Sequence, residues 1–200
     1  QSPETLMLLH PAGPVSTAQS AMVLSAVTPA LRAEADRLRD TLAEAGIVHP
    51  FPIQSMTLPI ALSGQDIIGQ AKTGTGKTLG FGIPAVQNVV GRDDDGWDRL
   101  ERPGAPQALI VVPTRELAVQ VGSDLSIAAK TRNARVLTIY GGRAYEPQIE
   151  ALEKGVEVVV GTPGRLIDLN RQHHLDLSQV KTVVLDEADE MLDLGFLPDV

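Results

Sequence analysis

Five short stretches of the chain are almost continuously apolar, without a polar residue at every second position. They span residues 66–69, 108–112, 136–140, 157–160 and 182–185. A strand with one face in water alternates apolar and polar side chains, whereas a strand covered on both faces does not. These runs therefore predict a mostly parallel sheet that is buried beneath helices.

Between the runs, apolar residues recur at helical spacing. Leu31, Ala35, Leu38, Leu42 and Ala45 fit one face of a helix that ends before a glycine, as helices commonly do. Further helices are predicted at about 53–62, 77–90, 115–130, 147–154 and 163–171. Strands and helices thus alternate, which is typical of an α/β fold with helices on both faces of the sheet.

The length and composition favour one domain with an aliphatic core. The chain has 200 residues, of which only 3% are aromatic, and this length is too short for two domains of ordinary size. The absence of cysteine excludes disulfides and thiolate metal sites and agrees with a reducing, cytoplasmic location. No apolar run approaches the ~20 residues that cross a bilayer, so no membrane partner is expected.

Two segments depart from this pattern. Residues 1–30 are rich in Pro, Ser and Ala without a clear period, so we expect a flexible or adaptable leader before a domain at 31–200. The stretch 91–106 holds eight charges, two prolines and three glycines, and it includes Trp97. We interpret it as a charged, exposed insertion loop, either solvated without a function or in contact with a partner.

The net charge of −8 at first argues against a nucleic-acid partner, because such partners normally require a basic surface. The excess is local, however. Residues 186–200 contain six acids and no base, which leaves 19 acids against 17 bases in the rest of the chain. The acids near the end of the chain therefore need a specific explanation.

A glycine-rich loop lies between a predicted strand and a predicted helix. It reads Ala71, Lys72, Thr73, Gly74, Thr75, Gly76, Lys77 and Thr78. Gly74 and Gly76 allow the backbone N–H groups to turn inward, and the helix that follows presents its positive end, so the loop suits the phosphates of a nucleotide such as ATP. Lys77 can reach the outer phosphates and the Thr78 hydroxyl can bind Mg²⁺.

A metal bound to phosphates needs a second acidic ligand from a neighbouring strand. Asp186 follows the run 182–185, which places it at the carboxyl end of a buried strand, where ligands collect in open α/β sheets. We predict that Asp186 holds Mg²⁺ through water and that Glu187 orients or deprotonates the attacking water. By contrast, His173 and His174 lie beside each other on a predicted surface loop and lack a second cluster, so no metal is expected there.

Several motifs, in order, carry a resemblance to a known family. Residues 186–189 spell DEAD, and 113–118 spell PTRELA; Gly141 and Gly142 form a glycine pair, and 162–165 spell TPGR. Together with the phosphate loop they resemble the first RecA-like domain of a DEAD-box ATP-dependent RNA helicase, over roughly residues 30–200. The resemblance implies a RecA-like P-loop NTPase fold that binds ATP and Mg²⁺.

The resemblance also implies roles for these motifs. In the family the corresponding segments bind the RNA sugar-phosphate backbone without reading sequence. Here they are Pro113, Thr114, Arg115, Gly141, Gly142, Thr162, Pro163, Gly164 and Arg165. Residues 46–54 resemble the motif that recognises adenine, with Gln54 as the base-reading residue. The family couples ATP hydrolysis to RNA unwinding or ribonucleoprotein remodelling.

The sequence departs from the family pattern at several positions. Pro29 stands where the family has an aromatic residue that stacks on adenine, Ile47 replaces the usual Phe, and Phe51 replaces a small hydroxyl residue. The chain also ends at Val200, before the second RecA-like domain of the family, so this fragment alone is expected to be nearly inactive. Two alternatives remain: another P-loop NTPase, and a non-catalytic RNA or protein interaction module that has kept the fold.

Overall fold

A computed structural model describes residues 4–11, 29–72, 74–196 and 198 of the protein. Within that part of the chain the centre is a six-stranded sheet with the order β2-β1-β6-β3-β5-β4. The strands are β1 Glu4–Pro11, β2 Ile67–Lys72, β3 Ala108–Val111, β4 Val136–Ile139, β5 Val158–Gly161 and β6 Thr182–Asp186. All five apolar runs of the sequence therefore form strands, with ends that differ from the predicted ones by at most three residues.

The sheet is parallel except for β1. β3 pairs in parallel with β5 and β6, and β5 pairs in parallel with β4. β1 is antiparallel to both of its neighbours, β2 and β6. It follows that β2 runs in the same direction as β6, so the carboxyl ends of five strands lie at one edge of the sheet.

β1 corrects one expectation from the sequence. Residues 1–30 were expected to form a flexible or adaptable leader, but Glu4–Pro11 form a strand in the interior of the sheet. The physical reason is the run Leu6–Leu9, which is as continuously apolar as the runs of the other strands. The leader residues 1–3 and 12–28 lie outside the part of the chain that the structure describes.

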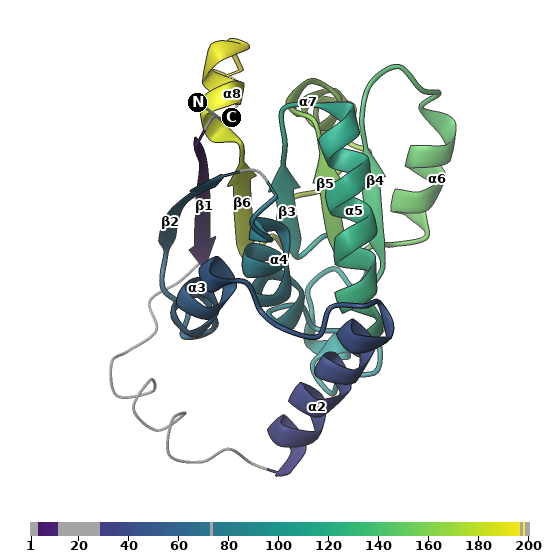
Figure 1. The fold of residues 1–200 in the computed structure, drawn as a ribbon. Helices are drawn as coiled ribbons and strands as arrows, with labels where there is room; N and C mark the ends of the chain where they lie inside the picture. The colour runs from purple at the N-terminus through teal and green to yellow at the C-terminus, as the bar shows by residue number, and fades with distance from the viewer. Residues whose placement is uncertain (1–3, 12–28, 73, 197, 199–200) are drawn as a thin grey trace.

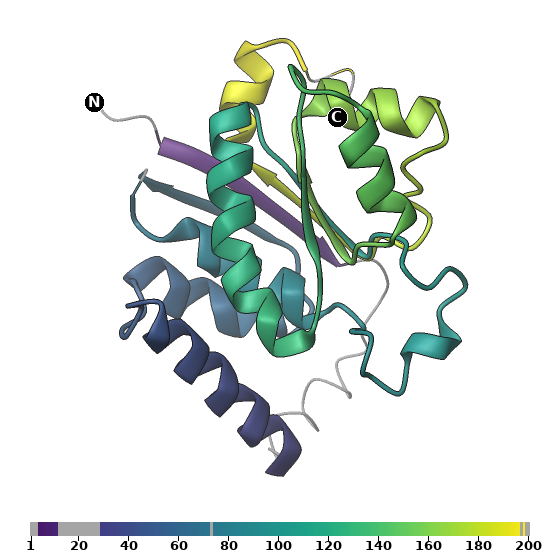
Figure 2. The same cartoon turned by 90° about the vertical axis from the view of Figure 1, so that its right-hand side faces the viewer.

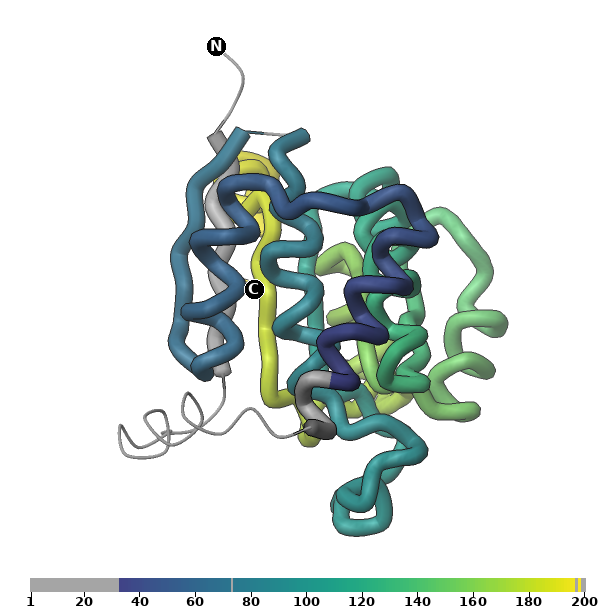
Figure 3. The backbone as a smooth tube through the Cα atoms, turned by 60° about the horizontal axis from the view of Figure 1, so that its bottom comes forward, coloured from purple at the N-terminus to yellow at the C-terminus, as the bar shows by residue number. Residues whose placement is uncertain are grey.

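Helices cover both faces of the sheet (Figures 1 and 2). They are α2 Pro29–Glu44, α3 Pro52–Leu62, α4 Lys77–Gln87, α5 Arg115–Ala129, α6 Glu146–Glu153, α7 Pro163–Arg171 and the short α8 Ala188–Asp193. α3, α4 and α5 lie on one face, α6 and α7 lie on the other, and α2 runs outside α5 (Figure 3). The predicted α/β fold is thus confirmed, whereas α8 was not predicted.

Two apolar cores explain why the strands lack alternation. One core joins alternate residues of the sheet to α4 and α5, with Phe81 and Leu125 fully buried. The other joins the intervening residues to α7, with Leu169 fully buried. In β5, Val158 and Val160 belong to the first core and Val159 to the second. β3, β4, β5 and β6 therefore bury side chains on both faces, as parallel strands between helices do. β2, at the edge of the sheet, differs, because Ile68 on one of its faces is exposed.

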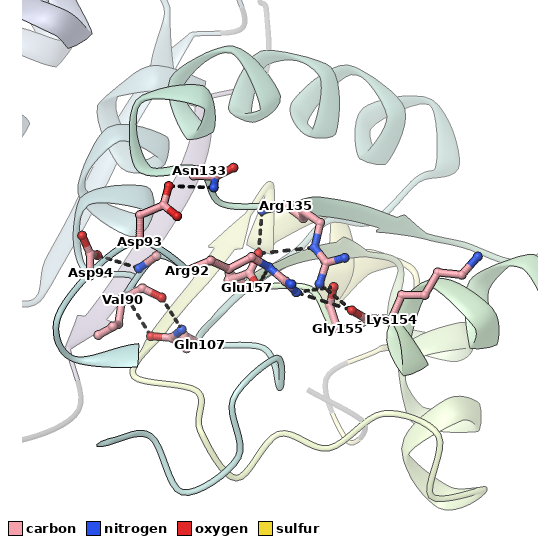
Figure 4. A network of polar contacts seen from close by, with 11 residues as sticks. Val90, Arg92, Asp93, Asp94, Gln107, Asn133, Arg135, Lys154, Gly155 and Glu157 are labelled. Atoms are coloured by element: carbon pink, nitrogen blue, oxygen red, sulfur yellow. Dashed lines mark hydrogen bonds and ion pairs between the residues drawn. The ribbon is translucent and has the colours of Figure 1, made fainter. Parts of the chain in front are cut away.

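The charged insertion 91–106 contains a short 3-10 helix, Trp97–Arg99, and is tied to the body at its start. Arg92 donates from Nε to Oε1 of Glu157 at 3.2 Å, while Glu157, which is fully buried, also accepts from the backbone N–H of Arg135 at 2.6 Å (Figure 4). Burial raises the pKa of Glu157, and the charge of Arg92 opposes that shift. This network lies at the amino-terminal end of β5, at the opposite edge of the sheet from the phosphate loop.

No helix in the described ranges is both long and apolar enough to span a membrane.

Candidate functional site

The glycine-rich loop follows β2 directly and leads into α4. Gly74 and Gly76 have φ angles of 82° and 79°, a left-handed conformation that favours glycine. Thr75 fixes the turn by donating from Oγ1 to the carbonyl oxygen of Lys72 at 2.6 Å. The loop therefore bends back so that α4 begins at Lys77 with its amino end towards the loop. Thr73, a predicted loop residue, lies outside the described residues.

Lys77 is the first residue of α4 and is buried, with 8% of its surface exposed. Its ammonium nitrogen is buried and has no hydrogen-bond partner among the described residues. A buried ammonium without a partner is unfavourable unless an anion binds it. The left-handed glycines, the helix start and this ammonium together fit the phosphates of a nucleotide.

Asp186 and Glu187 lie at the carboxyl end of β6, on the same edge of the sheet as the loop. Asp186 is 3% exposed, and burial raises the pKa of its carboxyl group while the charge of Lys77 opposes the shift. Glu187 has φ 54° and ψ 46°, which turns the chain sharply from β6 into α8. The pKa of Glu187 is raised to about 7, mainly by burial, then by its hydrogen bond with Glu190 and the charge of Asp186.

A pocket of about 250 Å³ joins these elements. The predicted site residues that line it are Gln54, Gly74, Gly76, Lys77, Thr78, Asp186 and Glu187. A larger charged hollow of about 650 Å³ lies between α2 and the insertion, but it includes none of these residues. The chemistry of the lining, rather than the volume, therefore identifies the candidate active site.

The same pocket contains residues that sequence reasoning did not assign. Gln120 and Asp124 reach it from α5, and Ile47 and Phe51 reach it from the segment before α3 and its first turn. Burial raises the pKa of Asp124. Gln120 and Asp124 follow the end of the PTRELA motif by two and six residues, but only the packing of α5 beside α4 brings them to the loop.

Gln54 connects the start of α3 to the phosphate loop. Its Nε2 donates to the carbonyl oxygen of Gly76 at 2.8 Å, and its Oε1 accepts from the backbone N–H of Phe51 at 3.0 Å. A glutamine amide has two donor hydrogens and two acceptor lone pairs. One hydrogen and one lone pair therefore remain for a ligand, although Gln54 is only 3% exposed.

The other predicted motifs lie at the carboxyl ends of β3, β4 and β5, on the same edge as the pocket. Thr114 caps α5 by accepting from the backbone N–H of Leu117 at 3.3 Å, and the side chain of Arg115 is 57% exposed. A Cβ built on Gly141, Gly142 or Gly164 would meet no atom within 4 Å. These glycines therefore present open backbone at the surface, while Pro113, Thr162 and Pro163 lead the chain from β3 and β5 into α5 and α7.

Arg115 forms an exposed ion pair with Glu116 at 3.3 Å, whereas Arg165 is buried and held by groups outside its own helix. Its guanidinium lies 3.8 Å from the centre of the Tyr145 ring, and its Nη2 donates to the carbonyl oxygen of Arg143 at 2.9 Å. Tyr145 in turn donates to Asp168 at 2.6 Å. Nη1 of Arg165 is buried and lacks a hydrogen-bond partner among the described residues. Tyr145 was not singled out from the sequence, because its role depends on packing between α6 and α7.

No group of three or more His, Cys, Asp or Glu side chains that could hold a metal occurs in the described ranges. Mg²⁺, however, keeps several waters and needs only one or two protein carboxylates together with phosphate oxygens. The pairing of Thr78 and Asp186 in one pocket fits that requirement. His173 is in a turn with φ 63° and, like His174, is exposed.

The chain was compared with known proteins. A family model described as DEAD/DEAH box helicase matches residues 51–200. DEAD-box ATP-dependent RNA helicase CshA of Streptococcus pneumoniae is 48% identical over 164 residues, covering 80% of this chain and 29% of that protein. ATP-dependent RNA helicase RhlB of Haemophilus influenzae is 45% identical over 163 residues, covering 82% and 38%.

Solved structures give the same match. The RNA-helicase Prp28 from Chaetomium thermophilum bound to ADP superposes with a TM-score of 0.71 at 40% identity, covering 80% of this chain and 38% of that one. A hypothetical ATP-dependent RNA helicase from Sulfolobus tokodaii superposes with a TM-score of 0.68 at 34% identity, covering 82% of this chain and 44% of that one. The chain thus spans less than half the length of these relatives.

Proposed function

The chain belongs to the DEAD/DEAH box helicase family, and we propose that it forms the ATP- and Mg²⁺-binding half of an RNA helicase. In this proposal the complete protein couples ATP hydrolysis to the unwinding of RNA duplexes or the remodelling of ribonucleoproteins. A cytoplasmic location, with which the cysteine-free composition agrees, is part of the same proposal.

The observation that carries the proposal is one pocket that contains the phosphate loop and both acids. Lys77 binds the outer phosphates with its otherwise unpartnered ammonium. Thr78 and Asp186 would hold Mg²⁺, which when bound neutralises charge on the phosphate oxygens. Glu187 orients the attacking water and accepts its proton, a role that suits a carboxyl group whose pKa is about 7.

RNA is proposed to bind along the loops that follow β3, β4 and β5. Arg115 offers an exposed guanidinium, and the starts of α5 and α7 offer backbone N–H groups. The open glycines at 141, 142 and 164 let a sugar-phosphate backbone approach closely. Contacts of this kind hold the strand without reading its bases.

A second RecA-like domain is the proposed partner of this half. The relatives are more than twice as long as the matched region, so the whole proteins contain more than this fold. The remaining part would close over the pocket and supply further charge to the transition state, as arginine fingers do in other phosphate-loop enzymes.

The proposal is tested first by removing the charge of Lys77. Lys77→Ala should weaken ATP binding by at least about tenfold, because the main cation on the outer phosphates is lost. Isothermal titration calorimetry with Mg-ATP measures this. Lys181→Ala is the matched control, because Lys181 is exposed and lies at the start of β6, at the other edge of the sheet.

Equal affinity of wild type and Lys77→Ala would reject the assigned site. A wild-type chain that binds no nucleotide at all would instead favour the non-catalytic interaction module.

A further inference from the structure

Phe51 places an aromatic ring at the wall of the pocket. It precedes α3, lines the pocket together with Gln54 and Lys77, and remains 49% exposed. A Cβ built on Gly76 would lie 2.5 Å from Cδ2 of Phe51, so the ring rests directly against the phosphate loop. The ring belongs to neither apolar core of the described residues. A large apolar side chain that the fold does not bury is available to a ligand.

The backbone around this ring is fixed in advance. Pro50 and Pro52 flank Phe51, which is extended with φ −72° and ψ 155°. The backbone N–H of Phe51 donates to the side-chain oxygen of Gln54, and the amide nitrogen of Gln54 donates to Gly76. The ring, the amide and the loop therefore form one connected unit, so the ring loses little freedom when a ligand binds.

The chemistry of the ring limits what it can recognise. It has no donor or acceptor, so it cannot bind phosphate or ribose hydroxyls by hydrogen bonds. It can stack on a flat heterocycle, and such stacking accepts every base because every base has a π-face. The position beside the phosphate loop leaves the base of the nucleotide as the partner within reach.

We propose that Phe51 stacks on the nucleotide base and that this ring gives the pocket its affinity for a base. The inference rests on the proposed nucleotide binding and names the group that holds the base.

In this proposal Phe51 and Gln54 have different effects on nucleotide binding. Phe51 contributes affinity for adenine and guanine alike, because every base has a π-face on which the ring can stack. Gln54 contributes selectivity, because its free donor and acceptor match the edge of adenine and mismatch guanine. A ligand that has phosphates but no base should therefore bind without either residue.

The test compares three ligands, ATP, GTP and inorganic tripolyphosphate, each with Mg²⁺, in a calorimetric titration. Phe51→Ala should weaken ATP and GTP binding alike, by about fivefold or more, and leave the affinity for tripolyphosphate unchanged. Phe51→Tyr should retain the affinity for both nucleotides. Met56→Ala is the matched control, because Met56 is an exposed apolar residue of α3 that does not line the pocket.

A second measurement does not depend on how well the alanine variant folds. Trp97 is the single tryptophan of the chain, so Phe51→Trp combined with Trp97→Phe places the only indole at the pocket. Its emission should change on addition of ATP and not on addition of tripolyphosphate.

Two results would overturn the proposal. If Phe51→Ala weakens tripolyphosphate as much as ATP, the ring acts only by supporting the loop at Gly76. If ATP affinity is unchanged or increases, the ring does not hold the base. Both results leave nucleotide binding by the wild type intact. Failure of the proposed function gives a different result, because the wild type would then bind neither ATP nor tripolyphosphate. In that case the role proposed for Phe51 is also wrong.

Discussion

Individual side chains in the pocket divide into those that a motif identifies and those that packing brings there. The place of Lys77, Thr78, Asp186 and Glu187 in the pocket could be predicted, because the proposed roles require fixed spacing from a strand end or a glycine turn. Phe51 could not, because nothing in its local sequence shows that its ring would face the loop from another element. Its distance to Gly76 depends on how α3 packs against α4.

Glu187 links the protonation of the site to the stability of the protein. Its pKa is raised to about 7 from an ordinary value of 4.5. The folded state therefore holds this proton more tightly than the unfolded state. The stabilisation is complete below pH 4.5 and is lost as the pH rises through about 7.

We expect the free energy of unfolding of the nucleotide-free wild type to fall between pH 5 and pH 7.5, roughly the window between these two pKa values. In Glu187→Gln the side chain cannot titrate, so the decrease should be smaller. Urea denaturation at several pH values measures the difference between the two proteins. Glu157 and Asp124 also have raised pKa values, but they are common to both proteins and cancel in the comparison. Asp186 is also common to both, but its charge acts on Glu187, so the difference between the two proteins reports the titration of this pair. If the free energy of unfolding depends on pH equally in the wild type and in Glu187→Gln, Glu187 does not take up a proton in this pH range.

Among the elements, β1 has the greatest effect on the site. It pairs with β2, which leads into the phosphate loop, and with β6, which ends at Asp186. The two strands that carry the chemistry do not pair with each other, so their spacing depends on β1. The sequence predicted the other five strands from their apolar runs. It did not predict β1, because the four apolar residues Leu6–Leu9 lie in a segment that is otherwise rich in Pro, Ser and Ala.

Disrupting β1 should therefore weaken nucleotide binding even though it contains no motif. Leu8 pairs with Ile68 on one side and Leu185 on the other. Leu8→Pro removes a backbone donor from an interior strand, which costs roughly 1–3 kcal/mol for the unpaired partner alone. We expect a lower denaturation midpoint and weaker Mg-ATP binding, both measured against Leu8→Val, which keeps the N–H. Wild-type ATP affinity in Leu8→Pro would show that β2 and β6 hold their positions without β1.

At the scale of the whole molecule, the pocket is incomplete. Its volume of about 250 Å³ is below the range of roughly 300–1,000 Å³ in which pockets enclose drug-sized ligands. A bound nucleotide would therefore stay partly open to water, where each electrostatic contact with the phosphates is weaker. Family membership and fold could be predicted from the sequence, since the motifs occur in order along nearly the whole chain. The extent of closure could not, because in our proposal it depends on a second domain.

We expect the 200-residue chain alone to hydrolyse ATP only slowly and not to unwind RNA. Arginine fingers supplied across such a cleft are worth about 10³ to 10⁵ in rate in other phosphate-loop enzymes. Strand separation of a short RNA duplex, measured for this chain and for a version extended by a second RecA-like domain, tests this expectation. Efficient ATP-dependent separation by the chain alone would contradict it.

The pairing of Met7 with Asp186 also bears on the order in which the protein assembles. β1 can join β2 once residue 72 has been synthesised, but its other edge stays open until residues 182–186 leave the ribosome. Contacts between such distant residues form late and slow the folding of a domain. An interior edge of the sheet is therefore exposed for most of synthesis, and such edges can pair wrongly with other chains. Because β6 leads to Asp186 and Glu187, which line the pocket, the step that closes the sheet is also the step that completes the candidate site.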